Sequence, residues 1–201
     1  MILSKEQKDS ISELINISFS KSAASLSELT GHRVLLSVPE VEIHPISDLQ
    51  KVLEKYVGGE ISTVHQIFNG AIAGDALLIL NKKSAISLAE LLTGNSFSES
   101  EAFNTTVREV IVEVGNILLN ACLGMFGNLL KVQFSFSVPS LHLESLDGML
   151  QTIVFDKQEL QYALIVFMEF RLRDSSVKGY LVIVLGVTSL DRFLKEVEVL
   201  G

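Results

Sequence analysis

The same spaced triplet of residues occurs twice in this chain, and the copies are offset by 100 residues. Each copy has the pattern E-x2-N-x22-P. The first copy consists of Glu13, Asn16 and Pro39, and the second consists of Glu113, Asn116 and Pro139. The chain has only 3 prolines, and two of them belong to these copies. A match at this spacing is hard to attribute to chance, so it predicts a duplicated unit with repeats at about 1–97 and 98–201.

Each Glu/Asn pair lies in a segment with the start and stop signals of a long helix. Ser4 with Gln7 three residues later is typical of a capping box, and Gly31 is a good stop signal. The second helix is predicted to span about 106–126, from a capping box formed by Thr106 and Glu109 to a glycine stop. Residues at i and i+3 of a helix are neighbours, so each Glu and its Asn share one face.

Strand-like segments follow each helix, and Pro39 and Pro139 fall in the first strand of each set, where proline suits an edge or a bulge. The predicted strands are 33–43, 63–68 and 76–80, then 131–143, 150–155, 162–172 and 177–187. Helices at 84–92 and 190–199 close the repeats. Each repeat is therefore a helix-strand-strand-strand-helix unit, with an added short helix after Ser47 in the first and an extra strand in the second.

One such repeat is too small to bury its own sheet, so both are expected to form one sheet. The predicted fold class is α+β: an internally duplicated, single domain over 1–201, with a six-stranded sheet, two long helices on one face and pseudo-two-fold symmetry. Because the pseudo-dimer is already within one chain, a monomer is expected.

Composition excludes several classes of function. Hydrophobic residues make up 48% and charged residues 20%, which is typical of a folded globular chain. The net charge is −8 and basic residues do not cluster, so nucleic acid is not an expected partner. The longest apolar stretches, 162–168 and 180–187, are shorter than the roughly 18 residues of a spanning helix. No apolar signal region follows the N-terminus. We therefore expect a cytoplasmic protein that does not bind membranes.

Neither the cysteine nor the histidines suggest a reactive or metal site. Cys122 is the only cysteine and lies in a helical apolar pattern, so a buried structural thiol is expected. The 4 histidines lack the spacing of metal ligands, and no metal or cofactor of the protein's own is predicted.

For one Glu/Asn pair alone, the simplest interpretation is a solvated helix surface. The duplication favours a site, because Asn is a poor helix former and is kept mid-helix in both copies. No nucleophile–base arrangement accompanies the pairs. A neutral amide can orient a water against a phosphoryl group without adding negative charge, and a carboxylate can anchor a Lys or Arg of a partner.

These residues resemble the signature of the CheC/CheX/FliY family of chemotaxis response-regulator phosphatases, [DS]-x3-E-x2-N-x22-P. Asp9, Glu13, Asn16 and Pro39 match it, whereas the second copy has Glu109 where Asp or Ser is usual. The resemblance covers essentially the whole chain, and two motifs are typical of CheC-type members, so it implies a single CheC-like domain.

The resemblance implies hydrolysis of the aspartyl-phosphate of a CheY-type response regulator. The helix would dock on the regulator, each Asn would position the attacking water, and each Glu would contact a regulator Lys. The Mg²⁺ would belong to the regulator. Two alternatives stay open: a binding module that regulates the CheD receptor deamidase, and a structural component of the flagellar switch.

Overall fold

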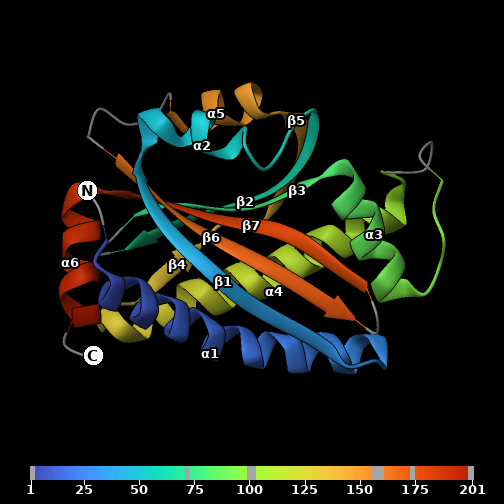
Figure 1. Cartoon of the computed structure of the whole chain (residues 1–201), viewed down its shortest axis with the longest axis horizontal. Coiled ribbons are helices and arrows are strands. Elements are labelled where there is room, and N and C mark those ends of the chain that lie inside the picture. Colours follow the sequence, from blue (N-terminus) through green and yellow to red (C-terminus); the bar gives the residue numbers. More distant parts are fainter. Residues whose placement is uncertain (1–2, 71–72, 99–102, 155–160, 173–174, 199–201) are drawn as a thin grey trace.

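The computed structural model describes residues 3–70, 73–98, 103–154, 161–172 and 175–198, which form six α-helices around one sheet (Figure 1). The helices are α1 (Lys5–Thr30), α2 (Leu49–Leu53), α3 (Lys82–Thr93), α4 (Thr105–Leu130), α5 (Leu146–Val154) and α6 (Val187–Glu198), and a short 3₁₀ turn, η1 (Ile46–Asp48), precedes α2. The strands are β1 (Val34–Pro45), β2 (Glu60–Gly70), β3 (Gly74–Asn81), β4 (Phe134–Phe136), β5 (Ser140–Ser145), β6 (Gln161–Leu172) and β7 (Ser175–Gly186). The α+β class is confirmed.

Strands from both halves of the chain pair in one antiparallel sheet, in the order β1-β6-β7-β3-β2-β4, and β5 also pairs with β2. The prediction of six strands is wrong by one among the described residues. The predicted strand 131–143 is present as two pieces, β4 and β5, which follow one another along the same side of β2. The strand order is unchanged if the halves are exchanged and the order is read from the other end.

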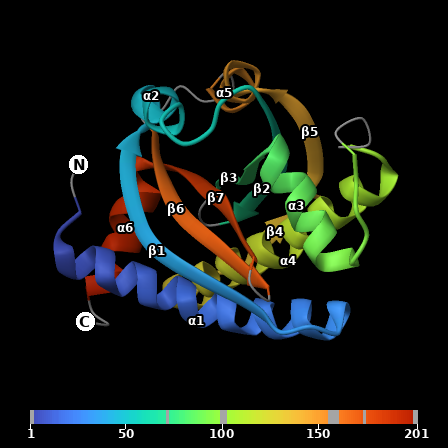
Figure 2. The ribbon, with the colours of Figure 1, turned by 45° about the vertical axis from the view of Figure 1, so that its right-hand side comes forward.

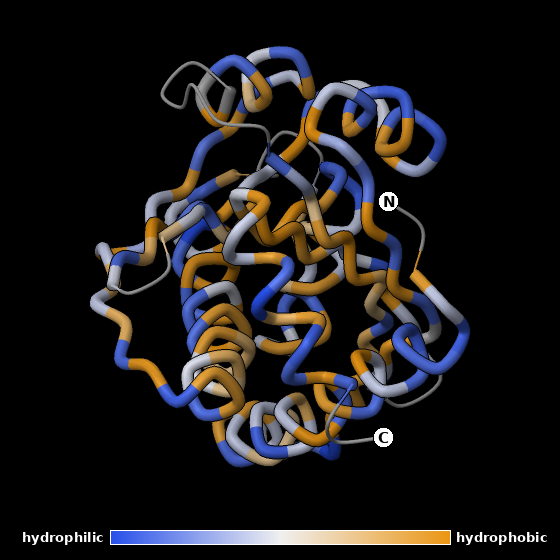
Figure 3. The backbone as a smooth tube through the Cα atoms, turned by 90° about the vertical axis from the view of Figure 1, so that its left-hand side faces the viewer, coloured by the Kyte–Doolittle hydropathy of each residue, from blue (hydrophilic) through white to orange (hydrophobic). Residues whose placement is uncertain are grey.

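The sheet separates two hydrophobic cores. The larger lies between the sheet and helices α1, α3, α4 and α6, and the smaller lies between the opposite face and the short helices α2 and α5. The two long helices therefore share one face, as predicted, and they run in opposite directions across it (Figures 1 and 2). Figure 3 shows hydrophobic stretches of the strands lying between the two layers of helices.

Helix α4 is the one helix among the described residues that is long and apolar enough to cross a membrane by length and composition. Half of its apolar window is buried within the protein. Its side chains, including Val114, Leu118 and Cys122, pack into the larger core, as in the central helix of many soluble folds.

The limits of α1 follow from its sequence. The Ser4 hydroxyl accepts from the Gln7 N–H at 3.1 Å, and the Gln7 side chain accepts from the Ser4 N–H at 2.9 Å, which completes a capping box. Gly31 ends the helix with φ of 66°, a left-handed conformation that glycine adopts without steric cost. Both predicted ends are confirmed.

The limits of α4 differ from the prediction. Asn104 rather than Thr106 caps its start, with the Asn104 side chain accepting from the Val107 N–H at 2.9 Å. Gly127 does not end the helix, which runs to Leu130 and stops at Lys131 in a left-handed conformation. A Cβ on Gly127 would lie 3.0 Å from the Val132 carbonyl oxygen, so this glycine permits a close approach of the chain that follows.

The predicted strand at 150–155 is wrong: residues 146–154 form α5, and Phe155 lies outside the described residues. The β-branched residues of this segment suggest a strand. However, four buried side chains recur at helical spacing and face the smaller core: Leu146, Met149, Leu150 and Ile153. Each half thus has a short helix between its first and second strand positions, α2 in one and α5 in the other.

Candidate functional site

The first Glu/Asn pair lies near the middle of α1, on a face that the core does not cover. Glu13 is exposed and Asn16 is half-buried. Asp9, one turn before Glu13, is exposed as well, and Ile17 is 56% exposed beside them. A partner that contacts this face of α1 would meet two carboxylates, one amide and one apolar side chain.

Asn16 is tied to the strand that follows its helix. Its Oδ1 accepts a hydrogen bond from the Val38 N–H at 2.9 Å. Strand β1 is at the edge of the sheet, where outward N–H groups lack a strand partner, and Ser27 of α1 likewise accepts from the Val34 N–H at 2.9 Å. Helix α1 therefore supplies hydrogen-bond acceptors to an open sheet edge, and Asn16 is one of them.

Pro39 immediately follows the residue that Asn16 holds. The register of β1 against β6 shifts between Ser37 and Glu40, so Val38 and Pro39 together lie opposite Met168. This is a β-bulge on an edge strand, a position in which a proline removes no sheet hydrogen bond. The expected place of Pro39 is thus confirmed.

The second pair, on α4, has the same exposure but different contacts. Glu113 is exposed and Asn116 is half-buried. The Asn116 Oδ1 accepts from Asn120 Nδ2 at 2.7 Å, and Asn120 Oδ1 accepts from Gln66 Nε2 of β2 at 3.3 Å. Glu109 is exposed one turn before Glu113, at the position where Asp9 precedes Glu13.

Pro139 lies between β4 and β5 rather than within a strand, so its expected place is corrected. The predicted strand is interrupted at 137–139, where Val138 is 89% exposed. Val38, at the same position relative to its proline, is only 6% exposed. The first site therefore has a bonded, covered Val38, whereas the second presents an apolar side chain to solvent.

The structure brings Glu and Asn together within each helix and places the two pairs near opposite edges of the sheet. The first pair is bonded to the edge strand β1, and the second is bonded through Asn120 to β2, which lies next to the opposite edge strand β4. Beside the second pair, a shallow hollow of about 590 Å³ is lined by Arg108, Glu109 and Glu113, among others.

Both asparagines keep hydrogen-bonding capacity for a ligand. Among the described residues, the Nδ2 of Asn16 and of Asn116 donates to no protein atom, while each Oδ1 accepts one bond. An amide oxygen has two lone pairs and an amide nitrogen has two N–H groups. Each side chain is therefore held by one atom and can still bind a water with the other.

Other reactive side chains are engaged elsewhere. Cys122 is fully buried, and burial raises the pKa of its thiol to about 12, so it is held as the inert thiol. His44 bonds Glu42 at 2.8 Å, and His65 bonds Asp75 at 3.0 Å. Both histidines lie in strands, His44 in β1 and His65 in β2.

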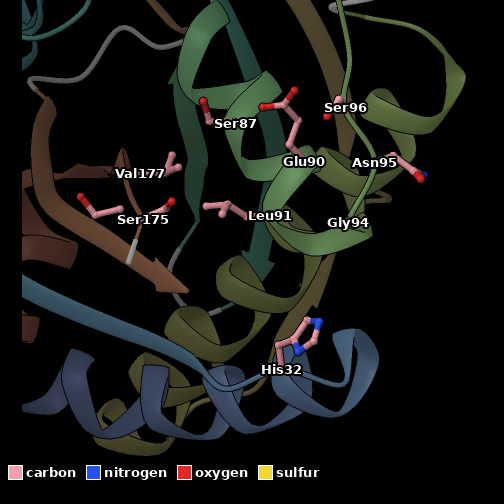
Figure 4. A pocket seen from close by; sticks show the side chains of 10 residues that line it. His32, Ser87, Glu90, Leu91, Gly94, Asn95, Ser96, Ser175 and Val177 are labelled. Atoms are coloured by element: carbon pink, nitrogen blue, oxygen red, sulfur yellow. The ribbon is translucent and has the colours of Figure 1, made fainter. Parts of the chain in front are cut away.

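A further hollow of about 460 Å³ lies at the far end of α1, between α3 and the start of β7 (Figure 4). His32, Glu90 and Ser175 contribute to its wall, and Glu90 there accepts from the Phe97 N–H at 3.0 Å. None of the motif residues lines this hollow.

Gln66 is a buried contact of the second site that the sequence pattern did not suggest. It is 2% exposed and alternates along β2 with the buried residues Val64 and Phe68. A polar residue in the inward phase of a strand is a detectable signal, because buried polar groups need partners.

Comparisons with known proteins point to one family. No family model matches the chain. It is 25% identical over 171 residues to the putative CheY-P phosphatase CheC1 of Halobacterium salinarum. This match covers 84% of this chain and 85% of that protein. It is 26% identical over 134 residues to the flagellar motor switch phosphatase FliY of Bacillus subtilis, which covers 66% of this chain but only 33% of FliY.

The fold matches the crystal structure of Thermotoga maritima FliY with a TM-score of 0.77 and 21% identity, over 98% of both chains. At this identity the structural match establishes the fold, and the two sequence matches connect that fold to FliY and CheC proteins. These sequence matches support membership of the CheC/CheX/FliY family.

Proposed function

We propose that this protein is a phosphatase with two sites, Glu13/Asn16 and Glu113/Asn116, which accelerates hydrolysis of the aspartyl-phosphate of a CheY-type response regulator. The observation that carries the proposal is the shared state of the two asparagines. Each lies three residues after an exposed Glu, is held through Oδ1, and keeps Nδ2 unengaged among the described residues. The names of the H. salinarum and B. subtilis relatives support this reaction class.

The chemistry asked of the asparagine is positioning. Hydrolysis needs a water in line with the scissile O–P bond, and negative charge develops on the phosphoryl oxygens and the leaving carboxylate. A neutral amide can hold that water without repelling the phosphoryl group, as a glutamine does in GTPases. Fixing Oδ1 to the protein reduces the rotational freedom that the amide would otherwise lose on binding.

The glutamates are proposed to anchor the regulator. Both are exposed on the same helix face as their Asn, so a Lys of the regulator can reach them as a charge-assisted partner. Asp9 and Glu109 add negative charge one turn earlier. The Mg²⁺ that neutralises the acyl-phosphate is proposed to be the regulator's own, so EDTA should abolish the acceleration by acting on the regulator.

The test is phosphate release from a phosphorylated CheY-type receiver. Asn16→Asp and Asn116→Asp are the informative changes, because Asp keeps an acceptor in the place of Oδ1 while it removes the Nδ2 donor. By analogy with loss of one oxyanion-hole donor, each should slow its own site by about 10²–10³-fold. A double variant that accelerates release as well as wild type does would refute the proposal.

A structural role in the flagellar switch is the second candidate, favoured by the match to a flagellar motor switch phosphatase. The double variant of Asn16 and Asn116 distinguishes the structural role from the phosphatase function. A switch component would keep its incorporation into the motor and its phenotype when both asparagines are replaced, whereas a phosphatase would lose function with its fold intact. Regulation of CheD remains a prediction of the sequence, and binding of purified CheD would test it.

We also infer that the two sites arose by duplication and that the protein acts as a cytoplasmic monomer. The identical motif spacing and the strand order that survives exchange of the halves support the duplication. An experimental structure in which the backbones of α1–α3 and α4–α6 fail to superpose would contradict the duplication. Light scattering that gives a dimer mass would contradict the monomer.

A further inference from the structure

Three side-chain amides connect the sheet to the second site in series. Gln66 of β2 donates through Nε2 to the backbone oxygen of Ser137 at 3.1 Å and to Asn120 Oδ1 at 3.3 Å. Asn120 in turn donates through Nδ2 to Asn116 Oδ1 at 2.7 Å. Asn116 is thus joined to a buried strand residue through one intermediate, Asn120.

The backbone oxygen at the start of this series fixes the orientation of every amide after it. A carbonyl oxygen can only accept, so Gln66 must turn Nε2 toward Ser137. The second hydrogen on Nε2 then requires the oxygen of Asn120 to face Gln66. Asn120 therefore turns Nδ2 toward Asn116, whose Oδ1 must accept and whose Nδ2 must face away.

Gln66, at the buried end of the series, favours this orientation of its amide over the flipped one. Gln66 is 2% exposed, and its Oε1 is buried without a hydrogen-bond partner among the described residues. An unpaired buried acceptor is unfavourable. The flipped amide would be worse, because it would set Oε1 against the Ser137 oxygen and remove both donated bonds.

The first site has no equivalent of this series among the described residues. Ser20 occupies the position that corresponds to Asn120, and its hydroxyl donates to the backbone oxygen of Asn16 at 2.8 Å rather than to the side chain. The Asn16 amide is oriented instead by the Val38 N–H, a backbone donor that is part of β1. The two sites thus orient the same amide by different means.

We propose that Asn120, itself held by Gln66, is a positioning residue that sets the orientation of the Asn116 amide and presents its Nδ2 to the attacking water. This inference rests on the proposed phosphatase function of Asn116. It assigns Asn120 no contact with the substrate. Its effect should therefore be on the chemical step of the second site alone, and binding of the regulator should be unchanged.

Asn120→Asp tests this with little change of shape. An Asp at 120 can still accept from Gln66, but it has no donor for Asn116. The Asn116 amide must then flip to donate Nδ2 inward, which turns its oxygen toward the water. The variant is made with Asn16→Asp, so that only the second site is active. Phosphate release from a phosphorylated receiver gives kcat and KM separately.

We expect kcat to fall by about 10- to 100-fold with KM unchanged, as misorientation of a positioned group typically causes. Asn120→Ala, which frees the amide to rotate, should lower kcat less. The matched control is Ser20→Ala with Asn116→Asp, which leaves only the first site active and should keep its kcat. Thermal unfolding shows whether each variant is folded. Raised ionic strength shows whether the added charge acts through docking, because such an effect would appear in KM and be screened by salt.

The result that would overturn the inference is specific. If Asn120→Asp and Asn120→Ala both keep the kcat of their parent while Asn116→Asp abolishes it, Asn120 does not position Asn116. A change confined to KM and removed by salt would also overturn it. If wild type itself does not accelerate release, the proposed function fails, and this inference fails with it.

Discussion

Replacing Gly115 by alanine should destabilise the protein, although alanine is the better helix former. Gly115 lies in α4, next to Asn116, where the helix packs closely against β2. A Cβ at this position would lie 2.6 Å from Val64 Cγ1 and 2.8 Å from Val64 Cβ, well inside ordinary van der Waals contact. Because the Val64 Cβ is fixed to the strand backbone, side-chain rotation cannot relieve the overlap, so the helix must move.

The same helix contains a matched control. Gly124 is exposed, and a Cβ added there would have no described atom within 4 Å outside its own stretch of helix. Gly124→Ala should stabilise the protein by about 0.8–1.0 kcal/mol through helix propensity alone. Gly115→Ala gains the same propensity but overpacks the core, which costs about 1–3 kcal/mol. The two variants should therefore differ by about 1–3 kcal/mol, with Gly115→Ala the less stable.

Urea denaturation measures this difference. With a slope of about 3 kcal/mol/M, the midpoints should be separated by about 0.3–1 M. Movement of α4 away from β2 should also disturb the bond from Gln66 to Asn120, so Gly115→Ala should lower phosphate release at the second site while Gly124→Ala leaves it unchanged. Coincident midpoints for the two alanine variants would refute the close packing of α4 on Val64.

Three further predictions concern the sites and the core. Glu13→Lys and Glu113→Lys should raise KM for the regulator at low salt, with the effect shrinking as salt screens the charges; a lowered kcat at unchanged KM would contradict the anchoring role. Asn16→Ala should cost about 1–3 kcal/mol in urea denaturation because the Val38 N–H loses its acceptor, whereas Asn16→Asp should keep most of that stability; equal losses would contradict this. Cys122 should resist iodoacetamide at pH 8 until the protein is unfolded, as read by mass spectrometry. Since burial raises its pKa from 9.0 to about 12, the unfolded thiol ionises first, and the free energy of unfolding should fall from pH 9 to 12 relative to Cys122→Ala.

Sequence reasoning succeeded where a local signal had no competitor. The capping box at Ser4 and the glycine at 31 indicate both ends of α1, because these signals act within one turn of the helix. It failed at the start of α4, where Asn104 and Thr106 are both acceptable caps. The choice between them depends on Val107, which is fully buried and sets the phase of the helix against the core.

The segment 146–154 is hard to assign from sequence because two patterns overlap in it. Its β-branched residues favour a strand, but Leu146, Met149 and Ile153 recur at helical spacing and fill the smaller core. The strand propensity of a few β-branched residues is routinely overridden by the burial of apolar side chains. The break of the second edge strand at 137–139 is likewise invisible in the sequence, since Val138 fits the alternation of a strand although it is 89% exposed.

The candidate site was predictable in its residues but not in its connections. Glu13 and Asn16 are exposed or half-buried on one helix face, as the i and i+3 spacing requires. What holds each amide depends on tertiary contacts between α1 and β1, and between α4 and β2. These join residues 22 and 54 positions apart in the sequence, and periodicity carries no information about such pairs.

The spacing of the motif has a physical reason in the first half of the chain. The 22 positions from Asn16 to Val38 take the chain out of α1, through a turn and back along the helix as β1, so that the Asn16 amide meets the N–H just before Pro39. The proline follows in the bulge, where its missing N–H is not needed. The Asn and the Pro of the motif are therefore connected through the hydrogen bond from the Val38 N–H to Asn16. The Glu makes no part of this connection and is free to contact a partner protein. In the second half, Asn116 is bonded to Asn120, and Pro139 separates β4 from β5. The motif can thus be kept in both halves while only the first uses it to close a sheet edge, which leaves the presented amide as the property that the two copies share.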